Sequence, residues 1–358
     1  MKESKEVNRI SRRDFLKGSA AVSAVSMLAM STGSLLSGCT PKSTGPVHVR
    51  FQPSWIPDVQ NGGIYAAMSE GYYEEAGLEM EILPGGPGIL GGAVLDSGDT
   101  EIGEMASSVD LVKIISQGSQ IVTFATFFQR SPAGLMYVKT DLEGNAVNEF
   151  TDGPVSLVGK RVGIQGGVNL PWSVMCAEAG VDPENDFEVV NVGYDPSPLF
   201  DGTIDAYWCF LTNQPGLIRA QGYDVGVIDS YDWGYRVPGN FYAVKPDYLE
   251  DNFDIVKNWL SSTIKGWEYC NSNCQVMADD IASRLEADFG TKAEHQVIQC
   301  QDQIPYIESP LTDEKGLLYA NLDDWENAIR ILNDMGELET VPKVEDFVTL
   351  DVLKAVYG

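Results

Sequence analysis

Residues 47–83, VHVRFQPSWIPDVQNGGIYAAMSEGYYEEAGLEMEIL, decide the fold class of this 358-residue chain. The segments 47–52 and 78–83 alternate apolar and polar residues, as half-buried β-strands do. Between them, residues 62–71 carry apolar side chains at helical spacing, and Gly71 stands where a helix C-cap belongs. A strand, a helix and a second strand in this order predict a β-α-β unit with parallel strands.

The same alternation of strands and helices continues on both sides of a polar insertion at residues 140–154. A continuous apolar run at 121–128 is typical of a buried strand covered on both faces. From about residue 252 amphipathic helices take over. We therefore predict two α/β units followed by a helical C-terminal region. The expected strands are 101–105, 121–128, 161–164, 187–192, 206–210 and 224–228, and the expected helices are 89–97, 110–117, 171–179, 199–202, 214–221, 255–270, 276–289 and 323–335.

The first 39 residues predict where the protein works. Residues 11–17, SRRDFLK, have the twin-arginine export signature, and a weakly apolar run leads from them to LSGC at 36–39, which resembles a lipobox. The alternative is a transmembrane anchor, but the Ser and Gly residues of the run make a poor bilayer helix. We predict removal of residues 1–38, a lipid on Cys39, a tether at 39–46, and an extracytoplasmic location anchored to the cell membrane.

The chain is strongly acidic, with 52 Asp and Glu against 24 Lys and Arg and a formal net charge of −28. Nucleic acids and anionic lipids are bound chiefly through Lys and Arg, so we expect no nucleic-acid partner. A solvated acidic surface does not by itself identify a ligand. Because the sequence has two His and no C-x-x-C pair, we also expect no metal site and no cofactor.

Five cysteines follow Cys39, an odd number. Cys270 and Cys274 are close enough in sequence to link two helices where these join, and Cys300 can reach either of them after a chain reversal. The sequence leaves this pairing open. Cys176 and Cys209 are expected to be buried thiols.

Further motifs stand in an informative order along the chain: GYYEEAGL at 71–78, SGDTEIG at 97–103, LVGKRVG at 157–163 and FDGTIDA at 200–206. In these motifs the chain resembles the nitrate/sulfonate/taurine-type substrate-binding proteins of ABC transporters, specifically the branch of thiamine-pyrimidine-precursor and riboflavin binders. The resemblance covers nearly all residues beyond the leader. Two departures are visible: Thr100 replaces the usual Ala, and Asn61 stands where precursor binders often carry His.

The resemblance implies an α/β, bilobed type II periplasmic-binding-protein fold with two doubly wound mixed sheets and a helical C-terminal region. Lobe 1 is expected to comprise residues 47–135 and 242–358, and lobe 2 residues 136–241. The resemblance further implies a monomer without enzymatic activity. Such a protein captures a small aromatic heterocycle, such as a thiamine pyrimidine precursor or riboflavin, between its lobes and delivers it to permease and ATPase subunits.

Ligands of open α/β sheets lie beyond the carboxyl ends of the strands, so the loops there supply candidate residues. Trp55 and Trp208 offer stacking faces for a planar ring, with a core position as the alternative for Trp55. Gly167 and Asn169 open a helix N-terminus, a setting that holds anionic or strongly polar groups, although a simple tight turn is the alternative. Ser107 has an alternative role as a helix N-cap. The predicted ligand-binding residues are Trp55, Asn61, Ser107, Gln129, Gly167, Asn169, Trp208, Asn213, Asp232 and Tyr235.

Three other functions are alternatives. A sulfonate or another small organic anion needs positive charge in its site, and Arg130 is the candidate Arg in a matched ligand loop. A pyrimidine synthase-like enzyme needs an internal His and clustered Cys on a matched loop. His48 and His295 lie outside the matched motifs, and only Cys209 stands beside one. A lipoprotein sensor that passes its ligand state to a membrane partner is not distinguishable from an importer component by sequence.

Overall fold

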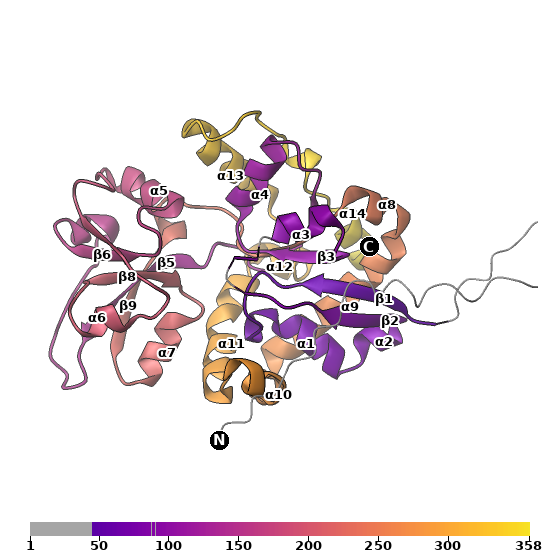
Figure 1. The fold of residues 1–358 in the computed structure, drawn as a ribbon, viewed down its shortest axis with the longest axis horizontal. Coiled ribbons are helices and arrows are strands. Elements are labelled where there is room, and N and C mark those ends of the chain that lie inside the picture. The colour runs from indigo at the N-terminus through magenta and orange to yellow at the C-terminus, as the bar shows by residue number, and fades with distance from the viewer. Residues whose placement is uncertain (1–44, 87, 90) are drawn as a thin grey trace, which may run out of the picture. The chain divides into compact units, whose positions relative to one another are not determined.

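Two five-stranded sheets, each covered by helices, organise the protein in the computed structural model (Figure 1). The structure describes residues 45–358 except 87 and 90, and these residues form one unit by their contacts. The predicted signal at 1–38, the predicted lipidation site Cys39 and most of the predicted tether lie outside the described residues. Within the described ranges, none of the helices combines the length and the apolar character needed to cross a membrane.

The first sheet contains the strands that the opening segment predicts, and we call it the sheet of lobe 1. Its order is β2-β1-β3-β10-β4, with β1 parallel to β2 and β3, and β10 antiparallel to β3 and β4. Its elements are β1 (Val47–Gln52), α1 (Gly62–Ser69), α2 (Tyr72–Glu75), β2 (Leu78–Ile82), α3 (Gly91–Ser97), β3 (Ile102–Met105), α4 (Ser108–Ser116), β4 (Val122–Thr126) and β10 (Phe241–Val244).

The second sheet belongs to lobe 2 and has the order β7-β6-β8-β5-β9. Strand β6 is parallel to β7 and β8, whereas β5 is antiparallel to β8 and β9. Both sheets are therefore mixed, as predicted. The elements of this lobe are β5 (Ala133–Thr140), β6 (Arg161–Ile164), α5 (Leu170–Ala179), β7 (Glu188–Asn191), α6 (Ser197–Phe200), β8 (Ala206–Phe210), α7 (Gln214–Ala220) and β9 (Asp224–Asp229).

The C-terminal region is helical and packs mainly on lobe 1. Its helices are α8 (Pro246–Asp251), α9 (Phe253–Ser272), α10 (Cys274–Phe289), α11 (Ala293–Ile307), α12 (Pro310–Lys315), α13 (Leu322–Asp334) and α14 (Asp351–Tyr357). Helix α9 lies against α1 so closely that a Cβ at Gly63 would collide with Trp267, and one at Gly266 with the Gly63 carbonyl oxygen. The two glycines therefore allow this helix pair to form.

The chain crosses between the lobes at residues 127–132 and again at 230–240, and the two crossovers are hydrogen-bonded to each other. The backbone N–H groups of Phe127 and Phe128 donate to the Asn240 carbonyl oxygen at 3.0 and 3.1 Å, and Ser131 N–H donates to Val237. The second crossover begins with the 3-10 turn η4 (Ser230–Trp233). The strands that follow the two crossovers, β5 and β10, begin at Ala133 and Phe241, and the lobe boundaries expected at 135/136 and 241/242 stay predictions.

A disulfide joins two of the C-terminal helices. Cys274 at the start of α10 is bonded to Cys300 of α11, and the buried Cys270 thiol lies 3.8 Å from the Cys300 sulfur. Of the pairings that the sequence leaves open, the structure therefore has Cys300 with Cys274. Cys176 and Cys209 are buried thiols, as predicted.

Candidate functional site

A cavity of about 350 Å³ lies between the two lobes. It opens beyond the carboxyl ends of β1 and β3 in lobe 1 and of β6, β7 and β8 in lobe 2, where ligands of α/β sheets bind. We call it the interlobe cavity. It is lined by Ser54, Trp55, Gln60 and Ala106 of lobe 1, and by Gln165, Asn169, Tyr194, Trp208, Cys209, Phe210, Asn213 and Gln214 of lobe 2.

Aromatic side chains from both lobes meet at this cavity. The rings of Trp55 and Tyr194 have centroids 5.3 Å apart and are inclined by 62°, an edge-to-face contact across the lobes. The backbone of Trp55 runs so close to the loop after β2 that a Cβ at Gly85 would collide with its carbonyl oxygen. Glycine at that position therefore helps to place the Trp55 loop. Trp208, in the middle of β8, adds a further ring and is largely buried.

Polar side chains of lobe 2 shape the opposite wall. Gln165 donates through Nε2 to the Trp208 carbonyl oxygen at 3.0 Å and to Gly193, the residue before Tyr194, at 3.4 Å. Asn169 caps α5, since its Oδ1 accepts from Trp172 N–H at 2.9 Å. Through its two hydrogen bonds, Gln165 holds the backbone at Trp208 and next to Tyr194, two of the aromatic residues of this wall.

Two buried polar atoms of the lining have no hydrogen-bond partner among the described residues: Ser54 Oγ and Gln214 Oε1. Buried polar atoms are nearly always hydrogen-bonded in native proteins. Both atoms belong to residues that line the interlobe cavity, and this makes them candidates for binding the polar groups of a ligand after a small side-chain rotation.

The lobe 1 wall rests on a buried carboxylate and on α11. The fully buried Glu104 side chain accepts hydrogen bonds from Gln60 Nε2 and Asn61 Nδ2 at 3.0 and 2.8 Å. These two residues belong to the 3-10 turn η2 (Val59–Asn61), which is capped by Asp58. Asp58 in turn accepts from Gln299 of α11 at 3.0 Å. Loss of hydration around the Asp58 carboxyl raises its pKa to about 6, despite these hydrogen bonds.

Among residues 45–358 without 87 and 90, none that lines the interlobe cavity is an Asp, Glu, Lys, Arg or His. The cysteine in the lining, Cys209, is buried, and burial raises the pKa of its thiol well above the usual range. A thiol with a raised pKa is a poor nucleophile at neutral pH. The cavity therefore offers stacking surfaces and neutral hydrogen-bonding groups, and no fixed charge in its wall.

The structure brings four of the ten predicted site residues into this cavity: Trp55, Asn169, Trp208 and Asn213. Asn61 lies behind the wall, where it binds Glu104, and Ser107 follows the lining residue Ala106 and caps α4 by accepting from Asp110 N–H. Gly167 lies in the turn before Asn169, with a φ of +92°.

The remaining three predicted residues lie elsewhere. Gln129 lines a different cavity, Asp232 is exposed in η4, and Tyr235 is buried in a hydrophobic cluster with lobe 1 residues. Sequence reasoning missed Gln60, Gln165, Tyr194 and Gln214, although all four follow strands in the way that the chosen residues do.

Gln129 lines a cavity of about 450 Å³ at the crossovers, together with Arg130. Arg130 is already engaged there, because its guanidinium lies 4.5 Å from the Tyr306 ring centroid and 3.6 Å from the Asp229 carboxylate. The Arg that an anionic ligand would require is thus held by an acidic residue outside the interlobe cavity.

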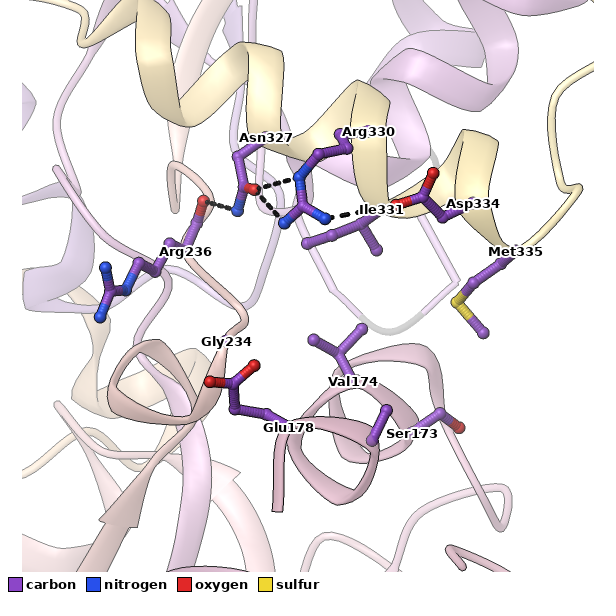
Figure 2. Close-up of a pocket in the computed structure, with 11 residues that line it drawn as sticks. Ser173, Val174, Glu178, Gly234, Arg236, Asn327, Arg330, Ile331, Asp334 and Met335 are labelled. Carbon is purple, nitrogen blue, oxygen red and sulfur yellow. Dashed lines mark hydrogen bonds and ion pairs between the residues drawn. The ribbon is translucent and has the colours of Figure 1, made fainter. Parts of the chain in front are cut away.

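A third cavity, of about 550 Å³, lies between α5 of lobe 2 and α13 of lobe 1 (Figure 2). Figure 2 shows Val174 and Glu178 on α5 facing Ile331 and Arg330 on α13. Arg330 binds Asn327 Oδ1 and also approaches Asp334 to 3.3 Å. The lining of this third cavity contains charged residues, and two of them, Arg330 and Asp334, form an ion pair with each other. The third cavity therefore differs in chemistry from the interlobe cavity, whose described lining residues are neutral.

Two α/β lobes joined by two crossovers, with a cavity at their strand ends, define a solute-binding protein of the periplasmic-binding-protein fold. The sequence profile described as "NMT1/THI5 like" matches residues 58–275, and the chain belongs to that family. A twin-arginine translocation signal matches residues 9–29, in agreement with the predicted export signal. The family assignment confirms the resemblance found in the motifs.

Two curated relatives cover most of the chain. The riboflavin-binding protein RibY of Chloroflexus aurantiacus is 24% identical over 310 residues, 84% of either chain. The formylaminopyrimidine-binding protein of Halalkalibacterium halodurans is 22% identical over 307 residues, 83% of this chain and 88% of that protein. A Schizosaccharomyces pombe 4-amino-5-hydroxymethyl-2-methylpyrimidine phosphate synthase matches at 26% identity, but over only 44% of this chain and 43% of its own.

Among solved structures, the periplasmic aliphatic sulphonate binding protein SsuA of Escherichia coli has the same fold. It superposes with a TM-score of 0.63 at 15% identity and covers 85% of this chain and 92% of its own. This similarity confirms the predicted fold class.

Proposed function

We propose that this protein is the extracytoplasmic binding component of an ABC importer and captures a small, uncharged aromatic heterocycle in the interlobe cavity. The observation that carries the proposal is the composition of the cavity wall. Four aromatic residues (Trp55, Tyr194, Trp208 and Phe210) stand among neutral polar side chains, and none of the described lining residues is an Asp, Glu, Lys, Arg or His.

Stacking would supply the affinity for such a ring. Aromatic pairs contribute about 0.5–1.5 kcal/mol beyond the burial of their area. Because Trp55 and Tyr194 come from different lobes, a planar ring held beside the pair contacts both lobes at once. The ligand therefore binds better when the lobes are together, which is how a ligand shifts a two-state equilibrium.

Neutral hydrogen-bonding groups would set the orientation of the ring. Gln214 Oε1 can accept only, whereas Ser54 Oγ can donate or accept. A heterocycle with an amino group or ring N–H beside ring nitrogens complements both atoms. The two relatives that cover most of the chain are named for binding a formylaminopyrimidine and riboflavin, and both molecules carry such edges.

The size of the cavity favours the smaller of these two chemistries. Ligand pockets range from about 300 to 1,000 Å³, so a cavity of about 350 Å³ lies near the lower end. A substituted pyrimidine fits this volume more readily than a tricyclic flavin with its side chain. We therefore propose a pyrimidine of the thiamine-precursor type as the ligand.

The alternatives are less well supported. A sulfonate requires a positive group in the site, and the part of the cavity wall that the structure describes contains no Lys, Arg or His. A pyrimidine synthase-like activity requires reactive His and Cys residues. Neither His48 nor His295 lines the cavity, and the raised pKa of Cys209 keeps its thiol protonated. Binding without catalysis is therefore the function that we propose.

The proposal includes the membrane anchor and the partners. After export and removal of residues 1–38, a diacylglycerol on Cys39 would hold the monomeric protein at the membrane through the tether at 39–46. There it would deliver its ligand to permease and ATPase subunits. Mass spectrometry of the protein purified from membranes tests the lipid on Cys39.

A thermal-shift screen tests the ligand class. The purified protein is heated with aminopyrimidines, riboflavin, taurine and an alkanesulfonate, since a bound ligand raises the melting temperature by mass action. We expect a shift with a neutral aminopyrimidine and none with the sulfonates. A shift with taurine or an alkanesulfonate alone would refute the uncharged-heterocycle proposal.

A further inference from the structure

Glu104 is a fully buried carboxylate at the end of β3, and each of its hydrogen-bond partners is a neutral N–H group. A buried carboxylate needs hydrogen bonds to both oxygens to offset its loss of hydration. Three of its four donors come from the segment after β1 and the fourth from the second crossover: Ser54 N–H at 3.1 Å, Gln60 Nε2 at 3.0 Å, Asn61 Nδ2 at 2.8 Å and Asn240 Nδ2 at 2.6 Å.

These donors link the interlobe cavity to the crossovers. Ser54 and Gln60 line the cavity, whereas Asn240 stands at the end of the second crossover, immediately before β10. The Asn240 carbonyl oxygen also accepts the backbone N–H groups of Phe127 and Phe128 in the first crossover. The Glu104 side chain therefore lies between the wall of the interlobe cavity and the two crossovers.

A single oxygen atom makes this link direct. Glu104 Oε1 accepts from Gln60 Nε2 and from Asn240 Nδ2, so a residue of the cavity wall and a residue of the crossover share one acceptor. A ligand that shifts Gln60 changes the geometry that this oxygen offers to Asn240. Lobe movements in bilobed proteins are produced by small rotations in such connecting segments.

We propose that Glu104 is a positioning residue that couples occupancy of the interlobe cavity to the relative movement of the lobes. This inference rests on the proposed function, because it takes the interlobe cavity as the ligand site. It assigns Glu104 no contact with the ligand. The residue acts through Gln60 and Ser54 on one side and through Asn240 on the other.

Glu104→Gln tests the inference with almost no change in shape. A carboxylate accepts on both oxygens, whereas the amide presents one oxygen and one NH₂ group to the same four donors. Donors that face the NH₂ group then lose their acceptor, which is the costly kind of hydrogen-bond change. Glu101→Gln is the matched control. It also removes a carboxylate near β3, but Glu101 binds Arg50 and touches neither the cavity nor a crossover.

The readouts are ligand affinity and the distance between the lobes. Formylaminopyrimidine binding is measured by calorimetry. The distance is measured by electron–electron spin resonance between labels at Glu79→Cys on lobe 1 and Glu184→Cys on lobe 2, both exposed positions. We expect Glu104→Gln to weaken binding at least tenfold and to abolish the narrowing of the distance distribution by ligand. We expect Glu101→Gln to behave as wild type within about twofold.

Asn240→Ala is a second variant, which removes only the bond to the crossover. It should leave the cavity wall in place yet reduce the ligand-induced narrowing, and its effect should not add to that of Glu104→Gln, because both act on one link. Unchanged affinity and unchanged distance response in folded Glu104→Gln protein would overturn the inference. If Glu104→Gln does not fold, Asn240→Ala decides alone: a wild-type distance response overturns the inference.

Failure of the proposed function gives a different result. In that case the wild-type protein binds no heterocycle, and the distance distributions of the ligand-free proteins decide the coupling. Broader distributions in Glu104→Gln and Asn240→Ala than in wild type and Glu101→Gln would support the link to the crossovers. Identical distributions would overturn it.

Discussion

Trp55 of lobe 1 and Tyr194 of lobe 2 meet edge to face, with ring centroids 5.3 Å apart, at the rim of the interlobe cavity. The contact joins a loop after β1 to a loop after β7, segments that are about 140 residues apart in the chain. Edge-to-face pairs of this kind are favourable in themselves. This ring contact therefore stabilises the present arrangement of the two lobes, and under the proposed function the same two rings would also contact the ligand.

The first prediction concerns these rings. Trp55→Ala and Tyr194→Ala should each weaken heterocycle binding by about threefold to tenfold. Each variant removes one stacking surface, which contributes about 0.5–1.5 kcal/mol beyond the burial of its area. The measurement is calorimetric titration with an aminopyrimidine. Tyr223→Ala is the control, since Tyr223 is a partly buried tyrosine of lobe 2 that packs on Phe200 away from the cavity lining. Equal affinities in all four proteins would contradict the stacking role.

The second prediction concerns the unpartnered oxygen of Gln214. Gln214→Leu removes an acceptor that the protein itself does not satisfy within the described structure, so the melting temperature of the ligand-free protein should not fall. Affinity for a ligand with an amino or ring N–H group should drop about tenfold, the value of one hydrogen bond of about 1.4 kcal/mol. A stable variant with undiminished affinity would exclude Gln214 from the site.

The third prediction concerns pH. Burial raises the pKa of Asp58 from 3.8 to about 6, and that of Asp324 also to about 6. The folded protein therefore holds these protons more tightly than the unfolded chain. The contribution of each of these two carboxyls to the free energy of unfolding should be fully present below about pH 4 and should be lost as the pH rises through about 6, by up to about 3 kcal/mol for a two-unit shift.

Urea unfolding between pH 4 and 7 measures this decline. Asp58→Asn should remove the contribution of the Asp58 carboxyl to the decline in the free energy of unfolding with pH. This change in slope is expected whether or not the variant also changes the free energy of unfolding at a single pH. Asp251→Asn, at an exposed position of α8, serves as the control and should leave the slope unchanged. A slope in Asp58→Asn equal to that of wild type would mean that Asp58 ionises normally in the folded protein.

The fourth prediction concerns the three clustered cysteines. The bond between Cys274 and Cys300 closes a segment of 26 residues in sequence separation, for which the loop-entropy relation gives about 3 kcal/mol. The Cys270 sulfur lies only 3.8 Å from that of Cys300. In Cys274→Ser protein folded under oxidising conditions, Cys270 should therefore take over the bond to Cys300.

Peptide mapping without reduction detects the new pairing, and urea unfolding should find most of the stability retained. The double variant Cys270→Ser with Cys274→Ser leaves Cys300 without a partner in this cluster and should lose about 3 kcal/mol. Cys176→Ser, a buried thiol of lobe 2, is the control. Free thiols at both Cys270 and Cys300 in the Cys274→Ser protein would contradict the prediction.

Much of the fold follows from local pattern. The strict alternation in 47–52 and 78–83 and the helix between them predict β1, α1 and β2 in the correct order. The helix α11 was not predicted, because its sequence is rich in Gln and contains Pro305, so its apolar positions do not stand out. Strand β10 was not predicted either, since its place between β3 and β4 depends on a chain reversal from the other lobe.

Candidate site residues could be predicted from the sequence only where the type of residue and its place relative to a strand were enough to suggest a role. Trp55 stands out as a large aromatic residue after a strand, and Trp208 as one within a strand. Tyr194 does not, because its role depends on a contact with Trp55 in the other lobe. Glu104 was also missed, since its donors come from the segment after β1 and from the distant Asn240, and nothing in the strand sequence IGEM indicates that they converge.

The most direct test of the central claim is a crystal structure of the protein grown with an aminopyrimidine. We predict density for a flat ring in the interlobe cavity, in contact with Trp55 and Trp208 and within hydrogen-bond distance of Gln214 Oε1. An interlobe cavity without ligand, or a ligand seated instead beside Arg130 or between α5 and α13, would contradict the account.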